Sequence, residues 1–348
     1  MVVTVREKLE EIERRTLHPR AARAAETRGR ERPEVEDDLR TAFQRDRDRI
    51  LHSKSFRRLK GKTQVFLAPK GDHYRTRLMH TLEVSQVART VARALGLNES
   101  LVEAMCMGHD LGHTPFGHAG ESVLREILPE GFHHVRQSVR VVEKLERDGA
   151  GLNLTIEVRD GILRHTKGKG AVLMQGAGQK ALTLEAEVVR IADIVAYVCH
   201  DLDDAVRAGL LEERDVPGPV AKLLGQSHGE RLDALVRDVV SRNDLDRAEH
   251  VELSEEVHGA LLALRDFLYA RVYENPLVHA EFVKAKKLLS DLRAHCLEDP
   301  ERFHRELWPT RREDDGLERE VVDFLCGMTD RYAIELYERL FVPRGWGE

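Results

Sequence analysis

Residues 109–118 read HDLGHTPFGH and decide the fold, because they place three histidines and an aspartate at the end of an apolar helical segment. The segment begins at Asn98, a suitable helix N-cap. Its apolar face comprises Leu101, Ala104, Met105 and Gly108. His109 continues that face at the next position, so we expect its ring to point into the protein.

A second helical segment brings another histidine to the interior. Apolar residues recur at helical spacing between Val84 and Leu95, and His80 extends this stripe by one turn toward the N-terminus. A lone histidine on an apolar face is more often a hydrogen-bonded core residue than a metal ligand. His80 is therefore interpreted as a metal ligand only together with other polar residues that point inward.

A third helical segment, residues 184–208, supplies acidic side chains. Three polar residues continue its apolar stripe at i, i+4 and i+8, and they are Asp193, Tyr197 and Asp201. A buried carboxylate without a partner is costly, so Asp110 and Asp193 need a cation or hydrogen-bond donors.

Four of these residues form a candidate metal shell of two imidazoles and two carboxylates. They are His80, His109, Asp110 and Asp193. Such a shell suits a divalent ion, and the pattern does not distinguish Mg, Mn, Co, Fe, Ni or Zn. An ion held with open coordination positions would activate a water molecule and neutralise charge on a phosphate.

Longer motifs extend the pattern from about residue 40 to residue 340. They are Phe43–Ile50, Phe56–Leu59, Lys62–Phe66, Gly71–Arg77, Gly108–Glu121, Ile191–Asp193 with Tyr197, His200–Ala205 and Gly327–Tyr332. On these residues the chain resembles the HD-domain deoxynucleoside triphosphate triphosphohydrolases, the dGTPase family, and in particular its bacterial dGTPase-like branch. The resemblance implies an all-α HD-domain hydrolase fold with the metal site in the helical core. It also implies hydrolysis of deoxynucleoside triphosphates at the α-phosphate, giving deoxynucleoside and inorganic triphosphate.

Length and composition agree with a helical protein that has a sizeable core. The chain has 348 residues, of which 33% are charged and 5% aromatic. No apolar run is long enough to span a membrane, and the N-terminus lacks the apolar segment of a signal peptide, so we expect no membrane association and a cytoplasmic location. The four cysteines lie far apart in apolar stretches, which favours packing over disulfides or zinc binding.

We expect three parts along the chain: an N-terminal helix and arm over residues 1–40, an HD-domain catalytic core over residues 41–210, and a C-terminal helical region packed on that core over residues 211–348. Residues 19–38 have few core-forming side chains, so we expect this arm to be disordered or to order against a neighbouring subunit. Residues 156–180 are rich in glycine and lysine and are interpreted as a mobile loop, either a linker or a substrate lid.

The net charge of −6 argues against a general nucleic-acid binder, because neutralising phosphates requires a basic surface. Basic clusters at residues 57–62 and 284–287, together with the arginine-rich arm, leave weak binding of single-stranded nucleic acid open. A solvated surface is the simpler interpretation of the second cluster. Family members are typically symmetric oligomers, so the resemblance implies a homo-oligomer as well as deoxynucleoside triphosphate as partners.

The resemblance implies a catalytic group just downstream of the metal ligands. His118 and Glu121 stand three residues apart, so they can meet on one helical turn. The resemblance makes them the dyad that handles the attacking water or the leaving oxygen. His113 and His134 are implied as phosphate contacts or proton donors, and a surface position is the alternative for each.

The resemblance also implies substrate contacts. It places Gln64 and Val65 near the sugar, Arg77 on the phosphates, and Tyr197 and Asp201 beside the deoxyribose. A tyrosine ring packed against C2′ leaves no room for a 2′-hydroxyl, so the site would select deoxynucleotides by exclusion. A core aromatic is the alternative for the tyrosine.

Three positions are harder to assign. Arg331 follows Asp330 in a matched motif, and a substrate contact, a helix cap or an intersubunit ion pair each fits this pair. The bacterial branch usually reads Phe-Glu-His-Asn where this chain has Phe-His-His-Val at residues 132–135, which leaves the role of His134 open. Ile194 stands where animal relatives carry a phosphate-binding lysine, so other cations must bind phosphate.

Two other functions remain open at this point. One is an HD-type phosphohydrolase or phosphodiesterase that acts on nucleoside monophosphates or cyclic nucleotides. The other is a non-enzymatic nucleotide sensor or single-strand nucleic-acid binder. Release of inorganic triphosphate would distinguish the expected activity from both.

Overall fold

The computed structural model describes residues 3–64, 75–128, 131–166, 180–309, 312 and 315–343. Within these ranges the chain is helical and has no strand, which confirms the all-α prediction, and two isolated bridges pair Arg30 with Thr155 and Thr63 with Thr76. In the same ranges no helix combines the length and apolarity that crossing a membrane requires.

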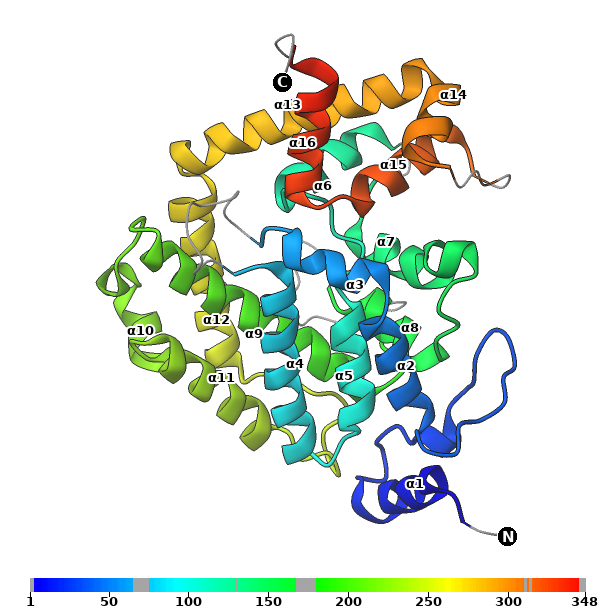
Figure 1. Ribbon diagram of the computed structural model, residues 1–348. Coiled ribbons are helices and arrows are strands. Elements are labelled where there is room, and N and C mark those ends of the chain that lie inside the picture. Colours follow the sequence, from blue (N-terminus) through cyan, green and yellow to red (C-terminus); the bar gives the residue numbers. More distant parts are fainter. Residues whose placement is uncertain are drawn as a thin grey trace.

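Sixteen α-helices are distinguished in the described ranges (Figure 1). They are α1 (Val5–Thr16), α2 (Ala42–Leu51), α3 (Lys54–Arg58), α4 (Arg77–Ala94), α5 (Glu99–Gly108), α6 (His118–Ile127), α7 (His134–Arg140), α8 (Ile156–Arg164), α9 (Leu184–Arg207), α10 (Gly218–Leu224), α11 (His228–Arg242), α12 (Glu255–Leu268), α13 (Pro276–Glu298), α14 (Pro300–Arg302), α15 (Leu317–Gly327) and α16 (Asp330–Phe341). Short 3₁₀ or π turns join them: η1 (Ala24–Glu26), η2 (Leu59–Gly61), η3 (Val141–Leu145), η4 (Arg147–Gly149), η5 (Glu213–Asp215), η6 (Tyr269–Tyr273) and η7 (Phe303–Leu307).

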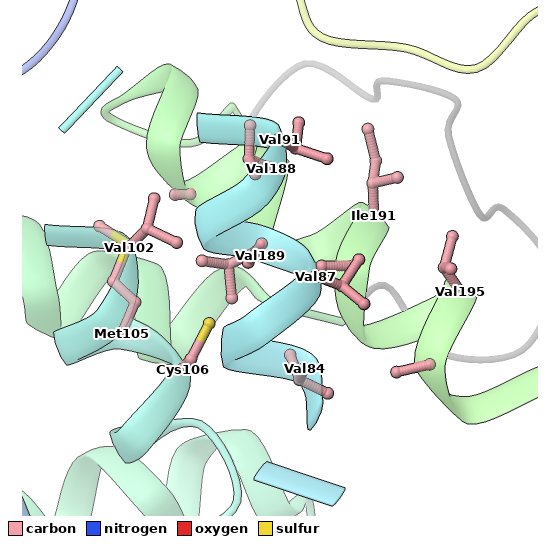
Figure 2. Packing of buried hydrophobic residues seen from close by; sticks show 14 of the residues in the cluster. Val84, Val87, Val91, Val102, Met105, Cys106, Val188, Val189, Ile191 and Val195 are labelled. Atoms are coloured by element: carbon pink, nitrogen blue, oxygen red, sulfur yellow. The ribbon is translucent and has the colours of Figure 1, made fainter. Parts of the chain in front are cut away.

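The larger hydrophobic core is built around α4, α5 and α9. Figure 2 shows valines of α4 meeting Val102, Met105 and Cys106 of α5 and the apolar face of α9. Asn98 caps α5 through its side chain, as the sequence predicts. Full burial of one aliphatic side chain contributes about 1.5–3 kcal/mol, so this interface holds the three helices in fixed register. All four cysteines are unbonded and buried, which confirms their packing role.

A second hydrophobic core joins α6 to the C-terminal helices. Phe116, Val123 and Leu124 pack with residues of α13, α15 and α16, while α10 to α12 contribute to the larger core. In Figure 1, α13 lies beside α6, α15 and α16 at the end of the molecule away from α1. The helix that carries Glu121 therefore packs on the C-terminal helices rather than on α4, α5 and α9.

The arm at residues 19–38 departs from expectation, because it is ordered against its own chain. The Arg20 guanidinium donates to the carbonyls of Leu245 (2.8 Å) and Glu249 (2.7 Å), and Arg30 forms a buried ion pair with Asp46. Ala21 and Ala24 enter the larger core. The arm is thus held by arginines that bond to carbonyls and carboxylates, which its low apolar content did not reveal.

The prediction of a loop at residues 156–180 is also wrong for the first part of this segment, which forms α8. Val158 and Ile162 are fully buried, and a Cβ at Gly161 would collide with the sulfur of Met105. Gly161 therefore serves close packing of α8 on α5 rather than loop flexibility. Residues 167–179 lie outside the described ranges.

Candidate active site

The four predicted metal ligands come together where α4, α5 and α9 meet. His80 Nε2 lies 3.1 Å from Asp193 Oδ1, and His109 Nε2 lies 3.4 Å from Asp110 Oδ1 and 3.7 Å from Asp193 Oδ1. One donor atom each of His80, His109 and Asp110 lies within 4.8 Å of the others. Ligand bonds of about 2.0–2.2 Å place neighbouring donors about 3–4 Å apart, so this spacing fits a single divalent ion.

The hydrogen bonds of His109 leave the correct nitrogen for a metal. Its Nδ1 lies 2.7 Å from the carbonyl of Cys106, so Nδ1 carries the proton and donates it. Its Nε2 is buried and has no hydrogen-bond partner among the described residues. A backbone carbonyl that fixes the tautomer in this way is typical of metal-binding histidines.

Both carboxylates of the group are held in their ionised form. Burial raises the pKa of Asp193, but the hydrogen bond with His80 and the charge of His109 outweigh it and lower the pKa to about 2. Burial opposes ionisation of Asp110 too, yet His109, His113 and Arg77 bring its pKa well below the usual range. A divalent cation requires ionised carboxylates, and it would compete with the imidazole protons that stabilise these two.

Asp110 connects the metal-ligand group to two other functional groups. Its Oδ1 lies 3.1 Å from His113 Nε2, and its Oδ2 accepts a hydrogen bond of 2.9 Å from Arg77. The Nε of Arg77 has no hydrogen-bond partner within the described part of the chain. The family resemblance implies that Arg77 binds the phosphates, and the structure adds that it donates a hydrogen bond to a candidate metal ligand.

A row of histidines extends from Asp110 toward α8. His113 stacks on His134 with ring centroids 4.0 Å apart, and His134 Nε2 lies 3.3 Å from His165 Nε2. His165 is buried, and its pKa falls to about 4 because of burial and the charge of His109. Sequence reasoning missed His165, although it follows Val158 and Ile162 at helical spacing and continues their buried stripe.

Glu121 turns toward His134, which the sequence did not predict. Glu121 Oε1 lies 3.3 Å from His134 Nδ1. Burial alone would raise the pKa of Glu121, but the hydrogen bond with His134 and the charges of His113 and His118 lower it strongly. The proposed pairing of Glu121 with His118 stays a prediction, and His134 joins that pair through the same carboxylate.

His118 lies beside two tyrosines rather than among the buried histidines. It is the exposed first residue of α6, and its ring faces Tyr197 and Tyr273 edge-on, with centroids 6.5 Å and 6.3 Å apart. The two tyrosine rings stack with centroids 6.4 Å apart, and the Tyr273 hydroxyl bonds to Asp201. Sequence reasoning missed Tyr273, because η6 carries no motif that relates it to α9.

The remaining predicted substrate contacts have different surroundings. Gln64 is buried, and its Oε1 has no hydrogen-bond partner within the described ranges. Val65 lies outside the described residues. Arg331 is on the surface, with 87% of its side chain exposed and an ion pair to Glu335, so the structure does not bring it to the buried cluster.

Two known domain families match parts of this chain. Residues 77–198 match the HD domain and residues 251–339 match the phosphohydrolase-associated domain. A solved structure of a hypothetical protein from Aquifex aeolicus is 21% identical, and the match covers 85% of this chain and 71% of that one with a TM-score of 0.46.

Three relatives are similar over nearly their whole length. A deoxyguanosinetriphosphate triphosphohydrolase-like protein from Desulfatibacillum aliphaticivorans is 50% identical, covering 98% of this chain and 99% of that protein. Proteins with the same description from Caldanaerobacter subterraneus subsp. tengcongensis and Clostridium tetani are 50% and 44% identical, covering 99% and 98% of this chain and 98% and 97% of theirs. The chain belongs to the deoxyguanosinetriphosphate triphosphohydrolase-like family of HD-domain phosphohydrolases.

Proposed function

We propose that this protein hydrolyses deoxynucleoside triphosphates, dGTP among them, to deoxynucleoside and inorganic triphosphate. The observation that carries the proposal is the position of Asp110, which contacts His109, His113 and Arg77 at once. A candidate metal ligand, a cation suited to phosphate and a histidine therefore surround one carboxylate, which is an arrangement suited to metal-assisted hydrolysis of a phosphate ester. The names of the relatives support the substrate class.

The reaction needs one bond to form and one to break. The oxygen of a water molecule bonds to the α-phosphorus, and the bond from that phosphorus to the 5′-oxygen breaks, which releases the nucleoside. A divalent ion held by His80, His109, Asp110 and Asp193 would supply charge neutralisation and acidify a bound water. Protein groups must then accept one proton and deliver one to the 5′-oxygen.

We assign these proton transfers to two histidines on different sides of the site. His134, oriented by ionised Glu121, lies in the row of histidines that begins at Asp110 and is placed to manage the proton of the water. His118 faces the two tyrosines and is placed to protonate the leaving 5′-oxygen. Arg77 keeps donors for a phosphate oxygen while it holds Asp110.

Selection of the sugar is assigned to the stacked tyrosines. Tyr197 is half-buried, and its ring is fixed by Tyr273, whose hydroxyl bonds to Asp201. A ring that stacks on a hydrogen-bonded tyrosine is hindered from moving aside for a 2′-hydroxyl, which favours exclusion. Asp201 accepts the hydrogen bond of the Tyr273 hydroxyl. Burial raises the pKa of Asp201 to about 8, so this carboxyl is protonated near neutral pH.

The test is an assay of the purified protein against the four deoxynucleoside triphosphates and GTP, each with Mg, Mn or Co, with chromatographic resolution of the products. Equal amounts of deoxynucleoside and inorganic triphosphate are expected. Pyrophosphate, or turnover of monophosphates or cyclic nucleotides alone, would indicate the other phosphohydrolase class. Tight nucleotide binding without any turnover would indicate a sensor.

Two partner predictions belong with this proposal. We expect a homo-oligomer, which light scattering of the purified protein measures. Weak binding of single-stranded DNA is expected to disappear at moderate salt, because few phosphates would be contacted by a chain of this charge.

A further inference from the structure

Asp330 directs its carboxylate into the protein although it begins a surface helix of the C-terminal region. It is 6% exposed. Its Oδ1 accepts a hydrogen bond of 2.9 Å from the backbone N–H of Phe116, and its Oδ2 accepts one of 2.9 Å from the backbone N–H of Thr63. The Thr63 hydroxyl donates to the same Oδ2. One carboxylate thus joins two segments that are far apart in the sequence.

These two segments carry candidate catalytic and substrate-binding residues. Thr63 precedes Gln64, and Phe116 lies between His113 and His118. The backbone between the two histidines is unusual, because Phe116 has φ of 61° and Gly117 has φ of 55°. A bulky residue with positive φ persists only when its surroundings hold it.

The two segments also touch each other closely. A Cβ at Gly117 would lie 3.2 Å from the carbonyl oxygen of Gln64, so the glycine permits the approach. Asp330 bonds to both sides of this contact and fixes their separation. A carboxyl side chain has two oxygens, so it can accept hydrogen bonds from both segments at once.

Lys62 provides a second link between the same parts. Its Nζ donates to the carbonyl of His113 and, at 2.7 Å, to the carbonyl of Cys326 in α15. Lys62 is buried, so its ammonium group donates to protein carbonyls rather than to bulk water. The C-terminal region is therefore linked to the loop through Lys62 at His113 and directly through Asp330 at Phe116.

A helix-capping role for Asp330 is not needed. Thr329 is the N-cap of α16, and its side chain accepts from the N–H of Tyr332. Arg331, the neighbour in the motif, points to solvent and pairs with Glu335. The inward carboxylate is the feature of this motif that reaches the candidate active site.

We propose that Asp330 is a positioning residue that holds the His113–His118 loop and Gln64 at their working separation, so that the C-terminal region completes the active site of the core. The kinetic part of this inference rests on the proposed function. The structural part does not, because it concerns the anchoring of two backbone segments.

The first experiment measures anchoring without any substrate. Asp330→Asn keeps the size of the side chain but has only one acceptor oxygen, so one of the two backbone N–H groups loses its partner. Hydrogen–deuterium exchange followed by mass spectrometry should become faster in peptides covering residues 113–118 or 62–64, with α4, α5 and α9 unchanged. Glu335→Gln, an exposed change on α16, is the matched control and should exchange like the wild type.

The second experiment measures positioning of the reacting groups. In Asp330→Asn, kcat for dGTP should fall by up to about 100-fold, as expected for a misplacement of about 1 Å. KM and metal content should stay near the wild-type values, because no metal ligand or direct substrate contact is altered. If Asp330→Asn does not fold, Thr63→Val removes only the hydroxyl donor and should show the same changes at smaller size.

The outcomes separate the two proposals. Unchanged exchange in both peptides would overturn the anchoring, and faster exchange with unchanged kcat would overturn the positioning role. A wild-type protein without triphosphohydrolase activity would overturn the proposed function, whereas faster exchange in Asp330→Asn would still support the anchoring.

Discussion

The two hydrophobic cores carry different halves of the candidate active site. The larger core fixes α4, α5 and α9, and with them the four candidate metal ligands. The second core fixes α6, which carries His118 and Glu121, against the C-terminal helices. Polar contacts join the halves, among them Asp110 with His113 and Asp330 with Thr63. Metal binding and proton transfer should therefore be separable by mutation.

The largest effect is expected from Asp193→Ala in the larger core. The substitution removes a carboxylate that contacts both His80 and His109, so metal content and turnover should be lost together. Circular dichroism should remain helical, because Asp193 contributes no apolar packing. Arg207→Ala, an exposed change at the end of the same helix, is the control. Undiminished metal content in Asp193→Ala would contradict the ligand assignment.

Glu121→Gln should impair only proton transfer, which depends on the half of the site that is fixed by the second core. A glutamine keeps the shape but removes the carboxylate that orients His134, so kcat should fall by about 100-fold or more, as is usual when general acid–base catalysis is lost. Metal content should remain normal, since Glu121 contacts no metal ligand that the structure shows.

Glu126→Gln, one turn further along α6 in an exposed ion pair with Lys286, is the matched control for this experiment. Wild-type turnover in Glu121→Gln would remove the residue from the catalytic machinery. Loss of metal from Glu121→Gln would show that the two halves are not separable.

Tyr197→Ala should change selectivity more than rate. Removing the ring opens the space that a 2′-hydroxyl would occupy, so the ratio of dGTP to GTP turnover should fall while dGTP hydrolysis persists. Tyr197→Phe keeps the ring and its stacking on Tyr273, so it should retain the preference for deoxynucleotides. An unchanged ratio in Tyr197→Ala would contradict exclusion by this side chain.

The sequence predicted the half of the site that depends on single helices. His80, His109 and Asp193 each continue an apolar stripe of their own helix, so local periodicity was enough to direct them inward. The other half depends on contacts between segments. Tyr273 reaches Asp201 across 72 positions, and His165 reaches His134 across 31. No spacing rule relates such residues, because the packing of one helix on another creates the pair.

The same reasoning explains the two corrected segments. The arm is rich in arginine and was expected to lack a fold of its own, but a partner such as buried Asp46 cannot be recognised from the arm alone. Glycines made residues 156–180 resemble a loop, whereas Gly161 is required where α8 meets Met105. Composition describes a segment by itself and does not include the surface against which it packs.

The last expected effect concerns stability rather than turnover, and it is a pH dependence that comes from Asp201. Burial is the main cause that raises its folded-state pKa from 3.8 to about 8. Between about pH 4 and pH 8 the folded state keeps a proton that the unfolded state releases, so stability from this group falls as the pH rises through that window. The slope is at most about 1.4 kcal/mol per pH unit.

In Asp201→Asn the side chain is neutral at every pH, so the Tm of this variant relative to wild type should rise steadily from pH 5 to pH 8. Asp203→Asn, on the same helix, is the control: Asp203 has a lowered pKa through its hydrogen bond with Arg75 despite some burial, so its Tm difference should be constant over this range. A constant Tm difference for Asp201→Asn as well would mean that Asp201 is ionised in the folded protein. The hydroxyl of Tyr273 would then be bonded to a carboxylate rather than to a neutral acid.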